Sequence, residues 1–330
     1  MKKVVRKMLM IVTVLILVSA IYLIWDNQRV KVVEQTVEIQ DLASELEGLT
    51  ILQITDLHEK NFGQNQEKII QSINRLEYDV IVFTGDMLNG EDSTNYKPFY
   101  NLIEGIDNKE FALYVPGNAD PENYYIDSEN NYVLNEFVQG MEERGVSLLE
   151  SASYFEKDGA RVRFDMFEMS ILHPDQGVVV AEGRVLPQYA HTREYREHHS
   201  RLAEEIHTLD EENHDLLVAL NHYPVVDERI EQLQSGRYVW RDFDLIMAGH
   251  YHGGQIRVPF IGALFVPEPW HSRGGLLPSS DRVSGLWEYE DTQQYVSRGL
   301  GASNFIPFLN FRVFNTPEIN LITFKNLSSS

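Results

Sequence analysis

Short apolar runs alternate with amphipathic segments along most of this 330-residue chain. Five runs are rich in Val, Ile and Leu and lead into Gly, Asn or Asp, at 49–55, 80–84, 111–116, 216–220 and 245–248. This pattern is typical of buried β-strands followed by turns. Between the runs, apolar residues recur at helical spacing, for example Ile69, Ile73 and Leu76. The alternation of strands and helices predicts one α/β domain.

The same reasoning predicts elements outside the five runs. Further strands are expected at 146–154, 160–166, 256–265 and 321–324, and a long charged helix at 193–209. Residues 267–284 are rich in Gly, Pro and Ser, and loops of this length are often functional. Within this loop, Arg273 is a candidate for contact with a phosphate, and Trp270 for packing against a base, sugar or acyl chain. The alternative interpretation is an ordinary surface loop.

Residues 8–25 contain no charged side chain and follow four basic residues. As a helix, this segment spans about 27 Å, close to the hydrocarbon thickness of a bilayer. The positive-inside rule then predicts a single-pass protein of the cell membrane, with a cytoplasmic basic tail at 1–7 and the rest of the chain outside. We expect a polar linker at 26–48 and one folded domain at 49–330. A cleavable signal peptide ending near Ala20 is the alternative, but apolar residues continue to Trp25, which favours an uncleaved signal-anchor.

The charge balance of the chain is strongly acidic. Lys and Arg number 28 against 50 Asp and Glu, which gives a net charge of −22. Binding of nucleic acid needs a basic surface, so the composition argues against a nucleic-acid partner. The chain has no Cys, which excludes thiol catalysis, disulfides and cysteine-bound zinc. Because the chain is acidic overall, an anionic substrate would have to be attracted by local positive charge, which bound metal ions supply.

The five apolar runs lead into side chains that bind metals. Proteins with an α/β sheet bind their ligands at the carboxyl ends of the strands. We therefore expect seven candidate ligands at one edge of one sheet: Asp56, His58, Asp86, Asn118, His222, His250 and His252. One tetrahedral ion takes three or four ligands, so seven indicate two divalent ions that share a carboxylate, and imidazole with carboxylate suits Mn, Fe, Zn or Co. Four other histidines, at 191, 198, 199 and 207, lie in or beside the charged helix and are expected on the surface.

These motifs resemble those of the calcineurin-like metallophosphoesterases. The family pattern is, in order, Asp-x-His, Gly-Asp-x-x-Asp, Gly-Asn-His-Asp/Glu, a lone His and Gly-His-x-His. In this chain the five motifs read, in the same order, Asp56-Leu57-His58, Gly85-Asp86-Met87-Leu88-Asn89, Gly117-Asn118-Ala119-Asp120, His222 and Gly249-His250-Tyr251-His252. The resemblance covers about residues 45–325 and implies a two-sheet αββα sandwich. Gly253-Gly254-Gln255, together with the stretch 295–301, resembles a branch of bacterial phosphodiesterases that are exported or held at the membrane.

The resemblance also implies a role for each candidate ligand. Asp56, His58, Asp86 and His252 would hold the first ion, and Asp86, Asn118, His222 and His250 the second, with Asp86 bridging them. A hydroxide between the ions would attack phosphorus, and Asn118 would also contact a phosphate oxygen. The implied activity is metal-dependent hydrolysis of a phosphodiester or diphosphate. The membrane position favours lipid-linked or envelope phosphates as substrates, with soluble phosphorylated small molecules as the alternative.

Two positions depart from the family pattern. Ala119 replaces the His that protonates the leaving oxygen in the family, and Asn89 replaces the Asp that orients this His. General acid catalysis is typically worth about 10²–10⁴-fold in rate, and a phosphate leaving group needs it less than an alkoxide does. One interpretation is therefore a substrate with a good leaving group, such as a diphosphate linkage or an activated diester. The alternatives are a slower phosphodiesterase that uses water or another side chain as the acid, and a non-catalytic metal-binding scaffold of the same fold.

Overall fold

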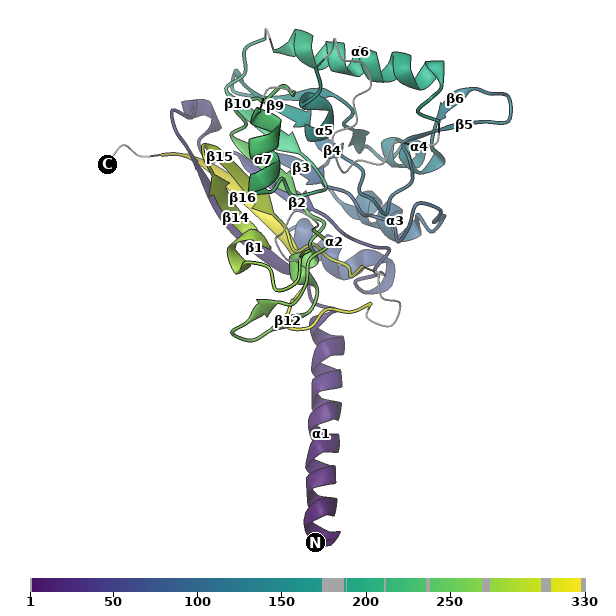
Figure 1. Cartoon of the computed structure of the whole chain (residues 1–330), viewed down its shortest axis with the longest axis vertical. Helices are drawn as coiled ribbons and strands as arrows, with labels where there is room; N and C mark the ends of the chain where they lie inside the picture. Colours follow the sequence, from purple (N-terminus) through teal and green to yellow (C-terminus); the bar gives the residue numbers. More distant parts are fainter. Residues whose placement is uncertain are drawn as a thin grey trace.

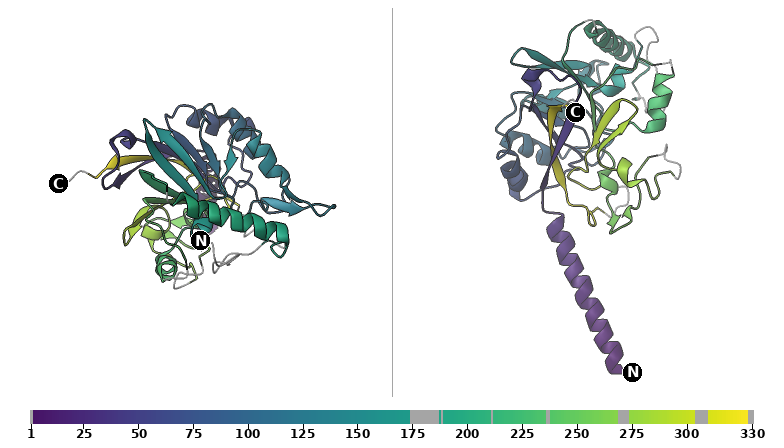
Figure 2. Two further views of the ribbon diagram at one scale, coloured as in Figure 1. Left: turned by 90° about the horizontal axis from the view of Figure 1, so that it is seen from above. Right: turned by 90° about the vertical axis from the view of Figure 1, so that its left-hand side faces the viewer.

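Two six-stranded β-sheets pack face to face and form the centre of the molecule (Figure 1). The computed structural model describes residues 2–173, 187, 189–210, 212–235, 238–268, 274–303 and 310–327. Helices cover the outer face of each sheet, and the two turned views show the same layers (Figure 2). The αββα sandwich expected from the sequence is therefore confirmed.

The first sheet carries the strands that precede three of the five predicted turns. Its strand order is β1, β16, β2, β3, β4 and β7, at Lys31–Ile39, Glu318–Asn326, Thr50–Ile54, Val80–Phe83, Ala112–Tyr114 and Ser147–Leu148. β2, β3, β4 and β7 run parallel, whereas β16 is antiparallel to β2. Successive side chains of a strand face opposite sides of its sheet. Ile51 accordingly lies in the core between the sheets, while Leu52 packs in the layer below the outer helices.

The second sheet carries the other two predicted turns. Its strand order is β14, β15, β11, β10, β9 and β8, at Gly285–Tyr289, Thr292–Val296, Leu245–Ala248, Leu216–Leu220, Ala160–Met166 and Ala152–Lys157. The four inner strands are parallel, and the edge strands β14 and β8 are antiparallel to their neighbours. Inner strands that are covered on both faces bury every side chain, which explains the uninterrupted apolar runs at β10 and β11.

In the described part of the chain, six helices form the outer layers of the sandwich. They are α2 (Glu67–Ile73), α3 (Lys97–Gly105) and α4 (Glu136–Glu142) over the first sheet, and α5 (Phe167–Ser170), α6 (Arg193–Leu209) and α7 (Asp227–Gln234) over the second. The charged helix predicted at 193–209 is confirmed as α6, and the Thr192 hydroxyl caps its first turn by accepting a hydrogen bond from the Tyr195 N–H. Shorter elements are the hairpins β5–β6 (Tyr124–Ile126, Tyr132–Leu134) and β12–β13 (Arg257–Val258, Gly262–Ala263) and 3₁₀ turns at Ser44–Leu46, Gln64–Gln66, His252–Gly254 and Ser280–Arg282.

Three expectations from the sequence differ from the structure. Residues 26–48 are not a linker, because β1 lies within them and pairs in parallel with β16, which continues the first sheet. The strand expected at 256–265 is the short hairpin β12–β13, since the turn between its two strands interrupts the run. His199 is buried rather than exposed, because it lies on the same face of α6 as Leu202 and Ile206.

Helix α1 (Lys2–Asp26) projects away from the sandwich (Figures 1 and 2). It is long and apolar enough to cross a membrane, and a signal sequence has the same properties. Its end is fixed to the domain by Asn27: the Asn27 amide donates to the Arg312 carbonyl, and the Arg312 N–H donates to Asn27 Oδ1, both at 2.8 Å.

Candidate metal centre

Six candidate ligands converge at the carboxyl ends of strands from both sheets. Asp56 and His58 follow β2, Asp86 follows β3, His222 follows β10, and His250 and His252 follow β11. The expectation that one edge of one sheet collects them is therefore wrong. The two sheets lie face to face, so the ends of β2 and β3 meet the ends of β10 and β11, and the site forms across the sandwich.

These six side chains form two groups that share one carboxylate. In each group the possible ligand atoms all lie within 4.8 Å of one another: Asp56, His58, Asp86 and His252 in the first, and Asp86, His222 and His250 in the second. Asp86 Oδ2 lies 3.3 Å from His58 Nε2 in one group and 3.3 Å from His222 Nε2 in the other. Asp86 therefore lies between the two groups and belongs to both.

Asn118 lies in the turn after β4, and its side chain is exposed. Its neighbour Ala119 donates its backbone N–H to Asp86 Oδ1 at 2.7 Å. On the other side, a Cβ at Gly117 would lie 2.2 Å from the same oxygen. The structure therefore places Asn118 beside the Asp86 carboxylate, on the exposed side of the centre.

The backbone at the candidate ligands is unusual. Five of them have a positive φ, namely Asp56 (53°), His58 (46°), Asp86 (57°), His250 (69°) and His252 (49°). Residues other than Gly rarely adopt this conformation, which costs on the order of 1–3 kcal/mol each and clusters at functional sites. Strand pairing and packing therefore hold these side chains against a local backbone preference.

Two glycines allow the loops to approach closely enough. A Cβ at Gly85 would lie 2.5 Å from the backbone nitrogen of Gly117 and 2.8 Å from His222 Nδ1. A Cβ at Gly249 would lie 2.2 Å from Thr55 Oγ1 and 2.6 Å from Asp56 Oδ2. Both glycines belong to the motifs quoted above, and the structure explains why no side chain fits there.

The imidazole nitrogens fit a bound cation. His222 Nδ1 lies 2.8 Å from the Thr84 carbonyl. A carbonyl oxygen can only accept a hydrogen bond, so Nδ1 carries a proton, and Nε2 is the ring nitrogen that faces Asp86. Among the described residues, Nδ1 of His58 and Nδ1 of His252 are buried without a hydrogen-bond partner, and His58 Nε2 faces the Asp86 carboxylate at 3.3 Å. Buried polar atoms are normally paired. Buried imidazoles beside shared carboxylates therefore match the donor set of a divalent metal ion.

The charges of the centre are strongly coupled. Burial raises the pKa of Asp86, but the charges and hydrogen bonds of His222 and His58 outweigh it and hold that pKa well below its usual range. Burial lowers the pKa of His222, and the Asp86 carboxylate outweighs this effect and raises it to about 9. Burial raises the pKa of Asp56 to about 6, while burial and the charge of His222 lower that of His250 to about 3. Protons on the imidazoles beside Asp86 and a bound cation would therefore compete for the same nitrogens.

Sequence reasoning missed the residues that support the ligand loops. The buried Asp120 carboxylate accepts the Leu88 N–H at 2.9 Å and the Gly117 N–H at 3.0 Å, so it connects the Asp86 loop to the Asn118 loop. The Leu300 N–H donates to the Thr55 carbonyl at 3.1 Å, which places the 295–301 stretch behind the Asp56 loop. Both features lie in motifs that the sequence contained, but their role depends on contacts between distant segments.

The two departures from the family pattern lie in the same loops. Ala119 is buried, and among the described residues Asn89 Oδ1 is buried without a hydrogen-bond partner. The predicted substrate contacts Trp270 and Arg273 lie outside the described residues.

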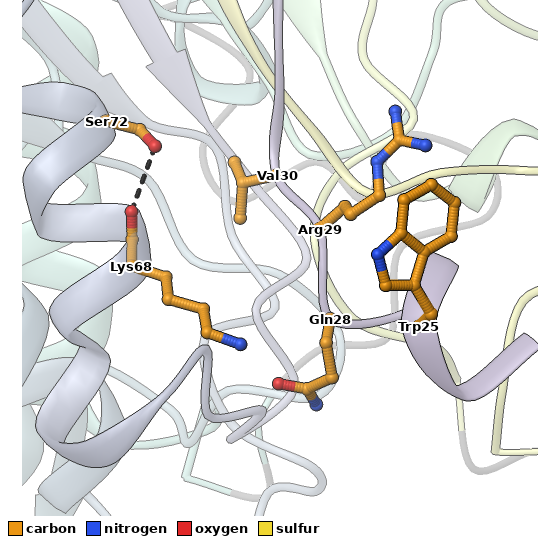
Figure 3. Close-up of a pocket in the computed structure, with 6 residues that line it drawn as sticks. All are labelled: Trp25, Gln28, Arg29, Val30, Lys68 and Ser72. Carbon is orange, nitrogen blue, oxygen red and sulfur yellow. Dashed lines mark hydrogen bonds between the residues drawn. The ribbon is translucent and has the colours of Figure 1, made fainter. Parts of the chain in front are cut away.

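A cavity of about 310 Å³ lies at the junction of α1 and α2 (Figure 3). Its lining residues are Trp25, Gln28, Arg29, Val30, Lys68 and Ser72. None of these six is a candidate ligand, so the cavity is separate from the metal centre.

Comparisons with known proteins agree with this geometry. The profile of the calcineurin-like phosphoesterase family matches residues 49–254. The metallophosphoesterases YkuE and YkoQ of Bacillus subtilis are 23% identical over 310 residues and 24% identical over 315 residues, covering 91% and 94% of this chain and 87% and 97% of theirs. The phosphodiesterase YaeI of Escherichia coli is 30% identical over 90 residues, which cover 27% of this chain and 28% of YaeI. The chain therefore belongs to the calcineurin-like phosphoesterase family and is a metal-dependent phosphoesterase.

Proposed function

We propose that this protein is a membrane-anchored phosphoesterase that uses two divalent ions to hydrolyse a phosphodiester or diphosphate outside the cytoplasm. The observation that carries the proposal is the position of Asp86, whose Oδ2 lies 3.3 Å from an imidazole nitrogen of each ligand group. A single ion would not need two histidine groups on opposite sides of one carboxylate. The alternative is a metal-binding scaffold, which the loss of the His–Asp pair at positions 119 and 89 favours.

The ligand assignment follows the two groups. Asp56, His58, Asp86 and His252 would hold one ion, and Asp86, Asn118, His222 and His250 the other, with Mn, Fe, Zn or Co as the candidate metals. When bound, the ions activate a water molecule near neutral pH and neutralise negative charge on the phosphoryl oxygens. The Thr84 carbonyl holds the His222 ring in place, and Asn118 lies at the open side, where it can donate its amide hydrogens to a phosphoryl oxygen.

The missing general acid at position 119 indicates which leaving groups the substrate can have. Ala119 is buried and carries no acidic proton, so the side chain at this position cannot protonate the leaving oxygen. An alkoxide leaving group therefore leaves without help from this position, whereas a phosphate or an aryloxide is a weaker base. We accordingly expect diphosphates or activated diesters to be better substrates than simple alkyl diesters.

The anchor sets where the reaction takes place. The basic residues of α1 lie in its first turns, ahead of the apolar stretch, which by the positive-inside rule leaves the amino-terminus in the cytoplasm and the domain outside. A domain held at the bilayer is well placed to act on lipid-linked or envelope phosphates. Soluble nucleotides outside the cell are the alternative substrates.

The test is an assay of the full-length protein in detergent micelles, loaded with Mn²⁺. Aryl phosphodiesters of graded leaving-group pKa and one nucleotide diphosphate are the substrates, Asp86→Asn is the blank, and bound metal is counted by elemental analysis. Two ions per chain, with a rate that falls steeply as the leaving-group pKa rises, support the proposal. A rate independent of leaving-group pKa overturns the substrate preference, and no turnover above the blank with metal bound favours the scaffold.

A further inference from the structure

The end of the domain from which α1 leaves carries exposed apolar side chains. The β12–β13 hairpin lies at this end in Figure 1 and in the right-hand view of Figure 2. At its tip, Phe260 is fully exposed and Ile261 is 62% exposed. Further exposed apolar residues lie in the segments that pair with this hairpin region, namely Phe265, Leu276, Leu277 and Phe314. Single exposed apolar residues are common, but a group of them on connected segments marks a binding surface.

The hairpin tip also has a strained backbone. Its turn is closed by the Ile261 N–H, which donates to the Val258 carbonyl at 3.1 Å. Phe260 is the third residue of this turn and has a φ of 69°, a conformation that favours Gly. A turn that only reversed the chain would carry Gly at this position and a polar side chain in the solvent. An exposed aromatic ring on a strained backbone therefore points to a role outside the fold.

The carboxyl-terminal segment connects α1 to this surface. Asn27 and Arg312 exchange two hydrogen bonds at 2.8 Å. One turn further into α1, the rings of Tyr22 and Phe314 lie 6.0 Å apart. Aromatic side chains at the end of a spanning helix typically lie at the level of the lipid headgroups. Phe314, which is 53% exposed, therefore lies at the same level as the end of α1.

The same segment connects the hairpin to the metal centre. The Arg257 N–H at the start of β12 donates to the Val313 carbonyl at 3.0 Å. The Asn315 amide donates to the carbonyl of His252, a candidate ligand, at 2.6 Å. In addition, the Arg257 guanidinium donates to the Gly253 carbonyl at 2.8 Å. The anchor, the hairpin and the ligand loop are thus held together by a short series of direct contacts.

The cavity at the junction of α1 and α2 has the composition of an interfacial surface (Figure 3). Its two charged lining residues, Arg29 and Lys68, are both cationic, and the Arg29 guanidinium lies over the Trp25 ring at 4.5 Å. Trp and basic residues are enriched where a protein meets lipid headgroups. Arg29 also pairs with the Asp26 carboxylate at 3.7 Å, so within this lining it is Lys68 that adds positive charge beside α1.

From these observations we infer that the tip of the β12–β13 hairpin inserts into the outer surface of the bilayer that α1 crosses. The inference rests on the anchoring part of the proposed function. Insertion gives the domain a second attachment point and fixes its orientation, so that the ligand loop lies close to the lipid surface. A substrate carried on a lipid headgroup would then reach the metal centre without leaving the membrane. The overall negative charge of the chain means that apolar contact, rather than general electrostatic attraction, holds the hairpin there.

Single-cysteine labelling tests the inference, because the chain has no Cys of its own. The full-length variants Ile261→Cys, Ile16→Cys and Tyr125→Cys carry an environment-sensitive fluorophore and are reconstituted into phosphatidylcholine–phosphatidylglycerol vesicles. Ile261 reports the hairpin tip, Ile16 reports α1, and Tyr125 is a matched exposed position in the β5–β6 hairpin at the far end of the domain (Figure 1). Quenching is measured with lipids brominated near the headgroup and with aqueous iodide.

We expect brominated lipid to quench the labels at positions 261 and 16, and iodide alone to quench the label at 125. Lipid quenching at 16 with only iodide quenching at 261 would overturn the inference and leave the anchor intact. Iodide quenching alone at all three positions would refute the anchor together with the inference. Phosphoesterase activity, measured on a soluble aryl diester, tests the proposed chemistry separately.

A second arm compares two substrates in the same vesicles. Phe260→Gly relieves the strained turn and removes the ring, whereas Phe260→Trp keeps an aromatic ring. We expect Phe260→Gly to lower turnover of an acyl-linked aryl phosphodiester in the bilayer severalfold, with turnover of the soluble analogue unchanged and Phe260→Trp retaining both. Equal turnover of the bilayer substrate by Phe260→Gly and the unmodified protein would count against insertion.

Discussion

Replacement of Gly249 by Ala tests whether the position of Asp56 limits turnover. A Cβ at residue 249 would lie 2.2 Å from Thr55 Oγ1 and 2.6 Å from Asp56 Oδ2, whereas Cβ atoms essentially never approach another atom within 3.0 Å. The loops must therefore move apart by at least about 0.8 Å at Thr55 and 0.4 Å at Asp56, the shortfalls from that limit. This movement separates Asp56 from the His250 N–H, which lies 3.2 Å from both of its carboxylate oxygens.

The size of the effect follows from packing and ligand geometry. Overpacking of a buried contact typically costs about 1–3 kcal/mol, so we expect the free energy of unfolding to fall by about that amount. Metal–ligand distances tolerate deviations of only about 0.2 Å, and a displacement of about 1 Å at a catalytic centre can cost about 10²-fold in rate. We therefore expect kcat on an aryl phosphodiester to fall by roughly 10–100-fold.

The assay compares full-length Gly249→Ala with Gly90→Ala in detergent micelles at saturating Mn²⁺. Gly90 lies in the neighbouring Asp86 loop, and no described atom lies within 4 Å of a Cβ built there, so this variant controls for the loss of a loop glycine. Thermal unfolding, bound metal and kcat are measured for both. The reasoning is refuted if Gly249→Ala keeps the turnover of the unmodified protein, or if Gly90→Ala loses as much.

Three further predictions concern the missing general acid, the pH dependence of metal binding and the β12–β13 hairpin. Ala119→His combined with Asn89→Asp should raise kcat for alkyl phosphodiesters by about 10²-fold or more and change aryl substrates little; equal gains on both would contradict the proposed leaving-group preference. Metal binding needs a neutral imidazole, so a His222 pKa of about 9 means that protons oppose binding below that pH. Calorimetric titration should then show Mn²⁺ affinity rising about tenfold per pH unit toward pH 9, and a pH-independent affinity would count against this coupling. Phe260→Gly should raise the free energy of unfolding by about 1 kcal/mol in thermal unfolding, because Gly adopts the positive φ without strain, whereas Phe260→Ala should not.

The sequence predicted the strands of the centre well because they are buried on both faces. The runs at 216–220 and 245–248 became β10 and β11 with the expected bounds, since a fully covered parallel strand must be apolar along its length. The motif order also identified the histidines and carboxylates that converge. By contrast, His199 was expected on the surface, because a mostly polar helix shows only a weak apolar stripe.

Pairing between distant segments could not be predicted from local pattern. Residues 26–48 look polar, yet β1 pairs with β16, which begins almost 290 residues later in the chain. The position of Asp120 between two loops is of the same kind, because its partners Leu88 and Gly117 are set by strand order rather than by spacing.

The sequence by itself determined the chemistry of this protein: which side chains can bind metal, which general acid is missing, and which segment can cross a membrane. These properties depend on residue type and on short spacing. Only the tertiary structure decided that the ligands come from two sheets, that Asp86 lies between two imidazole groups, and that the hairpin after the last ligand lies at the end of the domain from which α1 leaves. The physical reason is that these features depend on how sheets and loops pack against one another, and local sequence patterns carry little information about such long-range contacts.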